Sequence, residues 1–388
     1  MPDQTNLKTW FLKIAFPTKI FFASRIILFI IAYISLSVFP ARIGTDLLKP
    51  YPDKLYLDGW VRWDSSWYYD IAKNGYSYTP SPNIRQQNIA YFPLYPYMVR
   101  YLNHLVGDFY LSGIIIANIS FLFAIIGLYL LLSSQYTQDI ANNSILLLAF
   151  SPFSFFFSAM YSESLFLFSV VFAFLFASKK KWLLSSLFAA AAGATRLVGI
   201  LCILPILFFY LQDVHFNLKS IKLNILSLST ALLGPLSYMA YLTAHFGNPL
   251  IFLQVYKAPG WNEGVNLKMA LLTIKNMFLR LISANGDFGH GMVFGMNEIH
   301  LINLIISFGL LLLVIKKIHP AYSLWALTTI IASFSGWVSM SRYLVVVFPI
   351  YLAAALLIKE KHFNVVLACS ACLLSMYTIL FSHWFWIS

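Results

Sequence analysis

Residues 111–132 read LSGIIIANISFLFAIIGLYLLL and contain no lysine, arginine, aspartate or glutamate. A helix of roughly 20 such residues, rising 1.5 Å per residue, crosses a hydrocarbon core about 30 Å thick. A soluble protein with buried helices would show a polar face at helical spacing, and this stretch shows no such face. The segment therefore predicts a transmembrane helix in an all-α membrane protein.

The rest of the chain repeats this pattern. Of its 388 residues, 60% are apolar and 10% are charged, whereas a soluble domain usually carries about a quarter charged residues. Apolar blocks of helix length predict eleven spans. They lie near residues 18–39, 109–133, 143–160, 162–178, 182–195, 197–211, 223–244, 299–315, 321–338, 343–358 and 363–384. The pair 182–195 and 197–211 is predicted as two helices, because a single helix would place Arg196 in mid-membrane at a cost of about 2.5–3.5 kcal/mol.

Lysines in the short loops predict the orientation. With eleven spans, the clusters Lys8/Lys13/Lys19, Lys179–Lys181, Lys219/Lys222, Lys316/Lys317 and Lys359/Lys361 all fall on one face. The positive-inside rule makes that face cytoplasmic. Arg25, near the cytoplasmic end of the first helix, is predicted to snorkel to the interface.

Two long segments, about 40–108 and 245–298, then form structured outer loops of a single membrane domain covering residues 1–388. Trp60, Trp63, Trp67 and Ile71 recur at helical spacing and predict an aromatic stripe on a helix lying in the interface plane. Residues 266–281 predict a second surface helix.

Composition and spacing also exclude several kinds of site. The net charge of +12 is scattered between apolar blocks, which disfavours nucleic acid as a partner. The cysteines, Cys202, Cys369 and Cys372, lie in apolar stretches and match neither a disulfide framework nor a zinc site. His245, His290 and His300 fall in the second outer loop or at its edge, and their spacing matches no zinc pattern. No nucleotide fingerprint is present either. We therefore expect no metal, no cofactor and no nucleotide-sugar donor.

The outer-loop segments RWDSSWYYDIAKNGY (62–76) and AYFPLYP (90–96) carry the most informative motifs. Further motifs follow in chain order: SPFSFFFS at 151–158, YSESLF at 161–166, ATR at 194–196, FGNPL at 246–250, and MSRYL at 340–344 running into FP at 348–349. In this order they resemble the GPI mannosyltransferase II (PIG-V) family over nearly the whole chain. The family's FF-P is Tyr91-Phe92-Pro93 here, a departure that leaves the acidic residue untouched.

This resemblance implies a GT-C fold, a bundle of membrane helices whose first outer loop carries a catalytic acid. It maps the family's Trp-Asp pair onto Trp63 and Asp64, and it implies a polyprenyl-phosphate sugar donor, typically dolichyl-phosphate mannose in eukaryotes. The acceptor would be a glycan or a lipid-linked molecule. The active site would face the extracytoplasmic side of a bacterial cell membrane or, in a eukaryote, the lumen of the endoplasmic reticulum.

The chemistry of sugar transfer fits Asp64 independently. A hydroxyl that attacks the anomeric carbon needs one base to take its proton, and one carboxylate suffices for single-displacement inversion. Spacing alone leaves another interpretation open, in which Asp64 is a surface carboxylate paired with Arg62 or Lys73. Asp70, six residues on, would face away from Asp64 on a helix and is predicted to be solvated or to cap the helix.

A lipid-phosphate leaving group requires cationic side chains. Arg196 and Arg342 at predicted outer helix ends are the candidates, because the planar fork of arginine suits phosphate oxygens; interface anchoring by snorkelling is the alternative. Glu163 in an outer turn is a candidate for orienting the acceptor, binding an arginine or bridging a metal, and a purely structural ion pair with Arg196 or Arg342 is the competing interpretation. The other candidates for substrate binding or support are Arg62, Trp63, Trp67, Tyr68 and Tyr343.

Two other classes of function compete with the glycosyltransferase. A transporter or lipid flippase would place charges or broken helices near the bilayer midplane, often in inverted repeats. The charges here are predicted at the outer face, and no repeat is visible. A scaffold subunit of a membrane assembly is the third possibility, and the sequence favours the transferase.

Overall fold

A computed structural model describes residues 4–39, 50–81, 83, 85–259, 261, 296–334 and 339–387, together with 272, 275, 276 and 279. This part of the chain is helical and contains no strand. The elements are α1 (Gln4–Val38), α2 (Leu55–Asp58), α3 (Ser65–Asn74), η1 (Asn88–Ala90), α4 (Leu94–Val106), α5 (Phe109–Ser133), α6 (Gln138–Ala149), η2 (Ser154–Phe157), α7 (Glu163–Ser178), α8 (Trp182–Thr195), η3 (Leu197–Cys202), α9 (Ile203–Asp213), η4 (Leu218–Ser220), η5 (Leu223–Leu232), α10 (Leu233–Phe246), α11 (Ile251–Val255), α13 (Met296–Val314), α14 (Pro320–Ser333), α15 (Met340–Val345), α16 (Pro349–Leu357) and α17 (Glu360–Ser382).

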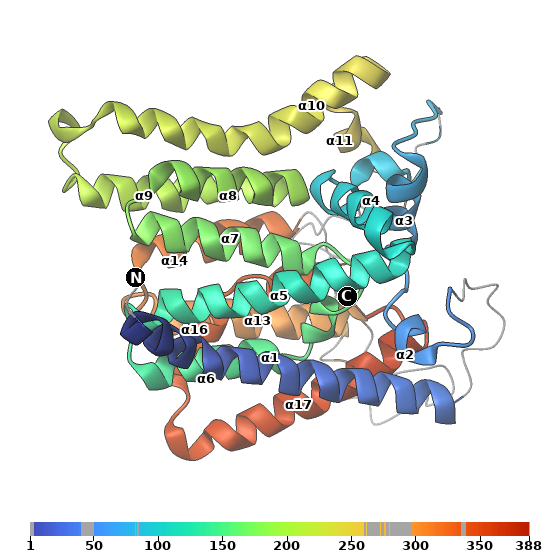
Figure 1. The fold of residues 1–388 in the computed structure, drawn as a ribbon, viewed down its shortest axis with the longest axis horizontal. Helices are drawn as coiled ribbons and strands as arrows, with labels where there is room; N and C mark the ends of the chain where they lie inside the picture. The colour runs from blue at the N-terminus through green and yellow to red at the C-terminus, as the bar shows by residue number, and fades with distance from the viewer. Residues whose placement is uncertain are drawn as a thin grey trace.

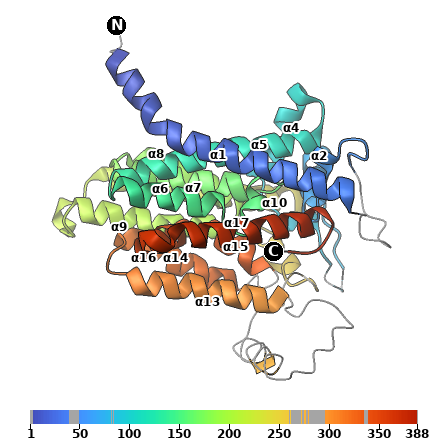
Figure 2. The ribbon, with the colours of Figure 1, turned by 90° about the horizontal axis from the view of Figure 1, so that it is seen from below.

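The long helices run side by side along one direction, as Figures 1 and 2 show. The short helices α2, α3, α4 and α11 gather at one end of this bundle, and the amino terminus lies at the other (Figure 1). We call these the α3 end and the amino-terminal end.

Four helices in the described residues are long and apolar enough to cross a bilayer. They are Lys13–Val38, Phe109–Ser133, Leu223–Phe246 and Glu360–Ser382. The other predicted spans coincide with shorter helices or with pairs of helices. The chain is thus a multi-pass membrane protein whose long helices lie in or close to the predicted spans, and within the described residues these four have the length of a full crossing.

Two segments predicted as single helices, 143–160 and 343–358, are each broken, so those predictions are wrong. The first stops at Ala149 and resumes as the short η2. The second is divided between α15 and α16, with Pro349 as the first residue of α16. Proline suits that position because its missing N–H would have no partner in the first turn. By contrast, the predicted division at Arg196 is confirmed, since α8 ends at Thr195 and Arg196 is extended with φ −153°.

Arg25 of α1 donates hydrogen bonds to backbone carbonyls at the first break, between α6 and η2. Its guanidinium donates hydrogen bonds to the carbonyls of Ala149 and Ser154, both at 2.8 Å, and lies 4.8 Å from the centre of the Phe121 ring. Only 4% of Arg25 is exposed. The predicted snorkelling is therefore wrong, because the broken helix offers carbonyl acceptors inside the bundle that an unbroken helix would have used itself.

We expect Arg25→Met to destabilise the protein by about 3 kcal/mol, since each buried carbonyl left unpaired costs about 1–3 kcal/mol. The apparent midpoint of thermal unfolding in detergent measures this effect. Lys19→Met is the matched control, because Lys19 is exposed on the same helix. Equal midpoints for the two variants would show that Arg25 does not support the break.

The first outer segment does not form the predicted interfacial helix with an aromatic stripe. The chain leaves α2 at Asp58, and α3 begins only at Ser65. Trp60 is 1% exposed and packs on Phe29 of α1, so it faces the bundle. The predicted helix over residues 266–281 lies outside the described residues, apart from four isolated positions.

The two outer segments meet in a small apolar cluster of their own. Phe92 of the first segment packs against Tyr238 and Phe252. The Tyr238 hydroxyl donates to the Ile89 carbonyl at 2.6 Å, and the Tyr256 hydroxyl donates to the Ala90 carbonyl at 2.6 Å. These contacts hold the start of the second outer segment against the first.

Candidate active site

Four charged side chains predicted from separate motifs meet at the α3 end. Arg342 Nη1 lies 2.5 Å from Asp64 Oδ2, and Arg196 Nη1 lies 2.8 Å from Glu163 Oε1. Arg342 Nε lies 3.2 Å from the same Glu163 oxygen, an ion pair in which the N–H is not directed for a hydrogen bond. We call Asp64, Glu163, Arg196 and Arg342 the charge quartet.

Each member of the quartet comes from the end of a helix or from a broken helix. Asp64 immediately precedes α3, Glu163 is the first residue of α7, Arg196 follows α8, and Arg342 lies in the short α15. The ends of these elements thus bring the four side chains to one place.

The quartet is buried and electrically balanced. Asp64 is 6% exposed, Glu163 1% and Arg342 7%, and the Arg196 side chain is 12% exposed. Two carboxylates against two guanidinium groups leave no net charge, which offsets part of the cost of removing these ions from water. Glu163 Oε2 is buried and has no hydrogen-bond partner among the described residues, so one acceptor atom is available to a ligand.

The loop that carries Asp64 is fixed on Tyr161. The Asp64 N–H donates to the Tyr161 hydroxyl at 3.2 Å, and this hydroxyl donates to the Arg62 carbonyl at 3.2 Å. Trp63 has φ +50°, which is uncommon for a residue other than glycine. Its ring packs edge-on against Trp384 and Trp386 at the carboxyl end of the chain. The carboxylate is therefore held by contacts with segments distant in sequence.

Arg62 plays a different part from its neighbour Asp64. It pairs with Asp58 at 2.6 Å, donates to the Ser382 carbonyl at 2.8 Å and lies over the Trp384 ring. It therefore attaches this loop to the end of α17. The interpretation of Asp64 as a surface carboxylate paired with Arg62 or Lys73 is wrong, because Asp64 is buried and its partner is Arg342. The ion pair considered for Glu163 is present, with both arginines as partners, and a role in orienting the acceptor stays a prediction.

Aromatic side chains surround the quartet. The Arg196 guanidinium lies 4.7 Å from the centre of the Tyr343 ring. The Tyr68 hydroxyl is hydrogen-bonded to Ser162 at 2.8 Å, next to Glu163. Tyr343 and Tyr68, both predicted as supporting residues, thus lie at the site. These rings restrict the arginine side chains and reduce contact of the ion pairs with water.

A second group of rings extends from Asp64 toward the second outer segment. Trp67 stacks on Tyr91, with ring centres 6.0 Å apart, and both rings contact Trp261. Burial, followed by the neighbouring Asp64 carboxylate, raises the pKa of the Tyr91 phenol well above its usual range. Tyr91 therefore stays protonated and can donate a hydrogen bond. Flat aromatic surfaces of this kind suit the apolar faces of a sugar ring.

The sequence interpretation missed Tyr161, Ser162 and Tyr91 as members of the site, although all three lie within the quoted motifs. Their position beside Asp64 and Glu163 in those motifs was the available signal. Asp70, predicted to be solvated or to cap the helix, accepts hydrogen bonds from Asn74 and Asn88. In the described part of the chain, no three His, Cys, Asp or Glu residues are grouped to hold a metal ion.

Known proteins resemble this chain in both sequence and structure. GPI mannosyltransferase 2 of Drosophila melanogaster is 28% identical over 187 residues, 42% of this chain and 39% of that protein. GPI mannosyltransferase 2 of Schizosaccharomyces pombe is 31% identical over 128 residues, 32% of this chain and 26% of that protein. The chain thus spans well under half the length of these curated relatives.

The solved structures with similar helix arrangements include an oligosaccharyltransferase of Archaeoglobus fulgidus tethered to an acceptor peptide. It has a TM-score of 0.48 and 13% identity, covering 97% of this chain and 56% of that one. The archaeal oligosaccharyltransferase from the same organism in complex with an inhibitory peptide and a dolichol-phosphate has a TM-score of 0.44 and 14% identity, covering 94% and 55%.

A match to a family model shows which protein family the chain belongs to. The model described as mannosyltransferase (PIG-V) matches residues 34–258, more than half of the chain, and includes Asp64, Glu163 and Arg196. The family expected from the motifs is confirmed, and the chain belongs to the mannosyltransferase (PIG-V) family.

Proposed function

We propose that this protein is a membrane glycosyltransferase of the GT-C type that moves a hexose, mannose in the first instance, from a polyprenyl-phosphate donor to a hydroxyl of a glycan or lipid-linked acceptor. Transfer takes place on the extracytoplasmic or lumenal face and inverts the anomeric carbon. Family membership supports the reaction class. The convergence of Asp64, Glu163, Arg196 and Arg342 supports the site.

Asp64 is the proposed general base. It takes the proton of the acceptor hydroxyl while the oxygen forms a bond to the anomeric carbon and the bond from that carbon to the phosphate oxygen breaks. Positioned base catalysis of this kind contributes about 10²–10⁴ in rate. The Asp64 N–H donates a hydrogen bond to the Tyr161 hydroxyl, and the ring of Trp63 packs against Trp384. These two contacts would hold the carboxylate in a fixed position for the attack.

Arg342 and Arg196 are the proposed partners of the leaving phosphate. Planar guanidinium groups donate paired hydrogen bonds to phosphate oxygens, and charge on the leaving group is stabilised as it develops. Arg342 also pairs with Asp64, with Nη1 2.5 Å from Oδ2, so one guanidinium group links the proposed base to the proposed phosphate site. A donor phosphate that draws Arg342 toward itself would leave the Asp64 carboxylate free to contact the acceptor hydroxyl.

Glu163 holds the two arginines together through one oxygen. Its other oxygen, buried and without a partner in the described part, is placed to accept a hydrogen bond from a sugar or acceptor hydroxyl. The rings of Trp67, Tyr91 and Trp261 form the proposed sugar platform beside Asp64. We place no metal in this mechanism, because the arginines supply the positive charge that the phosphate needs.

The decisive experiment supplies polyprenyl-phosphate [¹³C]mannose and a membrane lipid extract to purified protein in liposomes. We expect mass spectrometry to find a product carrying one labelled hexose, and nuclear magnetic resonance to show an anomeric configuration opposite to that of the donor. GDP-mannose in place of the lipid donor is the control and should give no product. Movement of the labelled lipid between leaflets without any glycosylated product would favour a flippase instead.

A further inference from the structure

The helix that carries Arg342 is too short to hold itself in place. Helix α15 spans six residues, Met340–Val345, whereas isolated helices shorter than about 12–15 residues are only marginally stable. Successive side chains of a helix are rotated by about 100° around its axis. Arg342 therefore reaches Asp64 and Glu163 in one rotation of α15, and the contacts that α15 makes with its neighbours set that rotation.

Neighbouring helices hold both ends of α15 through polar contacts. At its first residue, the Ser333 hydroxyl of α14 lies 3.0 Å from the Met340 sulfur. At its last residue, the Tyr351 hydroxyl of α16 donates a hydrogen bond to the Val345 carbonyl at 3.0 Å. These contacts fix where α15 lies in the bundle, but neither of them is made by a residue next to Arg342.

A buried histidine of α13 makes the contact beside Arg342. His300 Nδ1 lies 2.9 Å from the hydroxyl oxygen of Ser341, in hydrogen-bond contact, and Ser341 directly precedes Arg342. His300 is 1% exposed and Ser341 is fully buried. A hydrogen bond away from water is stronger than one at the surface, and leaving one of its partners unpaired is costly. The pair therefore joins α13 firmly to α15 at the position that sets the direction of Arg342.

The contact between His300 and Ser341 does not use the guanidinium group. The guanidinium is held by Asp64, 2.5 Å away, and by Glu163, 3.2 Å away. A phosphate that drew Arg342 toward itself would compete with these two carboxylates for the same N–H groups. The hydrogen bond of Ser341 would stay in place during this exchange, so it would keep the backbone of Arg342 aligned while the side chain changes partners.

We propose that His300 is a positioning residue for the donor phosphate, and that it acts through Ser341 by fixing the rotation of α15 that directs Arg342 at the leaving group. The inference rests on the proposed function, in which Arg342 binds the phosphate of a polyprenyl-phosphate donor. His300 contacts neither the phosphate nor the sugar in this proposal, and it transfers no proton. Its effect is on the affinity of the site for a phosphate group.

Binding of polyprenyl phosphate without a sugar tests the proposal, because this lipid carries the group that Arg342 would bind and requires no turnover. Native mass spectrometry of the full chain in detergent measures its affinity, and polyprenol, which lacks the phosphate, is measured in the same way. We expect Ser341→Ala to bind polyprenyl phosphate about tenfold more weakly, the effect of one buried hydrogen bond, and to bind polyprenol as the unmodified protein does.

Two variants of His300 separate its hydrogen bond from its volume. His300→Leu keeps a side chain of similar size but cannot bond to Ser341, so we expect the same loss of polyprenyl-phosphate affinity as in Ser341→Ala. His300→Asn carries an amide that can contact the Ser341 hydroxyl in place of Nδ1. We expect its affinity for polyprenyl phosphate to stay within about threefold of that of the unmodified protein.

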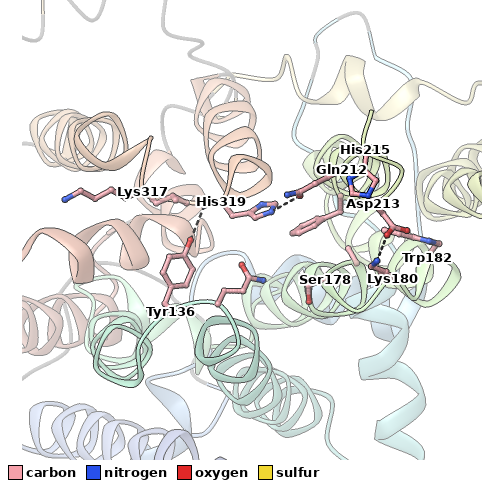
Figure 3. Close-up of a pocket in the computed structure, with 13 residues that line it drawn as sticks. Tyr136, Ser178, Lys180, Trp182, Gln212, Asp213, His215, Lys317 and His319 are labelled. Atoms are coloured by element: carbon pink, nitrogen blue, oxygen red, sulfur yellow. Dashed lines mark hydrogen bonds and ion pairs between the residues drawn. The ribbon is translucent and has the colours of Figure 1, made fainter. Parts of the chain in front are cut away.

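His319→Leu is the matched control, because His319 also joins two helices but lies far from the charge quartet. It precedes α14 in the wall of a pocket of about 840 Å³ at the amino-terminal end, and its Nε2 lies 3.0 Å from Gln212 Oε1 of α9 (Figure 3). Helix α7 runs from Glu163 in the quartet to Ser178 in this pocket, sixteen residues or about 24 Å. We expect His319→Leu to keep the polyprenyl-phosphate affinity of the unmodified protein.

The double variant His300→Leu/Ser341→Ala should bind polyprenyl phosphate no more weakly than the weaker of its single variants, because both substitutions remove the same hydrogen bond. Additive losses would overturn the proposal. Equal losses of polyprenyl phosphate and polyprenol in Ser341→Ala would overturn it as well, because they would show a general loosening of the lipid site and no specific effect on the phosphate.

Arg342→Gln separates a failure of this inference from a failure of the proposed function. We expect it to weaken polyprenyl-phosphate binding at least as much as Ser341→Ala does. If Arg342→Gln loses affinity and Ser341→Ala does not, the positioning role of His300 is wrong and the phosphate role of Arg342 stands. If Arg342→Gln keeps full affinity for polyprenyl phosphate, the phosphate role of Arg342 is wrong and the positioning role falls with it.

Discussion

Asp64→Asn is expected to lower the rate of mannosyl transfer by about 10²–10⁴, the contribution of a positioned general base. Asparagine has nearly the same shape and can still accept a hydrogen bond from Arg342, but it cannot take the acceptor proton. Donor binding should persist, since Arg196 and Arg342 remain. Single-turnover transfer from labelled polyprenyl-phosphate mannose measures the rate of transfer. Equilibrium binding of the same donor measures whether the variant keeps its affinity for the donor.

Asp70→Asn is the control for this variant. Asp70 lies in the same outer segment and bonds to Asn74 and Asn88, outside the charge quartet. We expect the rate of mannosyl transfer by Asp70→Asn to stay within about twofold of the rate of the unmodified protein, because substitutions outside the active site usually have small effects. A folded Asp64→Asn protein that retained more than a tenth of the original rate would remove Asp64 as the base.

Glu163→Gln is expected to destabilise the protein by about 3 kcal/mol, because breaking a buried ion pair leaves an uncompensated charge. Glu163 is 1% exposed and is shared by two arginines, of which Arg196 would lose its ion-pair partner. The apparent unfolding midpoint in detergent should fall by several degrees. Glu360→Gln, on the exposed first turn of α17, removes the same charge and should leave the midpoint unchanged.

A double variant separates the charge effect from simple loss of packing. Arg196→Gln combined with Glu163→Gln removes both partners, so we expect it to be more stable than the sum of the two single effects predicts. Additive losses would mean that Glu163 and Arg196 do not support one another. Because Glu163 also aligns Arg342 beside Asp64, we expect transfer to fall in Glu163→Gln even at a temperature where that protein is folded.

Sequence was a good guide to where helices would form. Runs such as 111–132 are too long and too apolar for anything but a helix in a bilayer, and α5 covers this run fully. The division at Arg196 was also predictable, since a charge in mid-membrane has a known cost. The breaks at Phe150–Phe153 and Val346–Phe348 were missed, although Pro152 lies in the first and Pro349 directly follows the second, and proline commonly ends or begins a helix.

The behaviour of single residues depended on partners that the local sequence does not contain. Arg25 has the local pattern of a snorkelling residue, yet the carbonyls of Ala149 and Ser154 hold it inside the bundle. Trp60 has helical spacing from Trp63 and Trp67, yet it packs on α1. In both cases a contact across the fold outweighed the local preference.

By itself, the sequence determined that the chain crosses a membrane, where most of the long helices lie, the family to which it belongs, and which acids and arginines are candidates for the site. Apolar length and short motifs are local properties, so the sequence displays them directly. Only the tertiary structure decided that Arg342 meets Asp64 across 278 residues and that Glu163 joins the two arginines. An ion pair depends on the distance between its two side chains and on their burial. Both follow from how elements far apart in the sequence pack together.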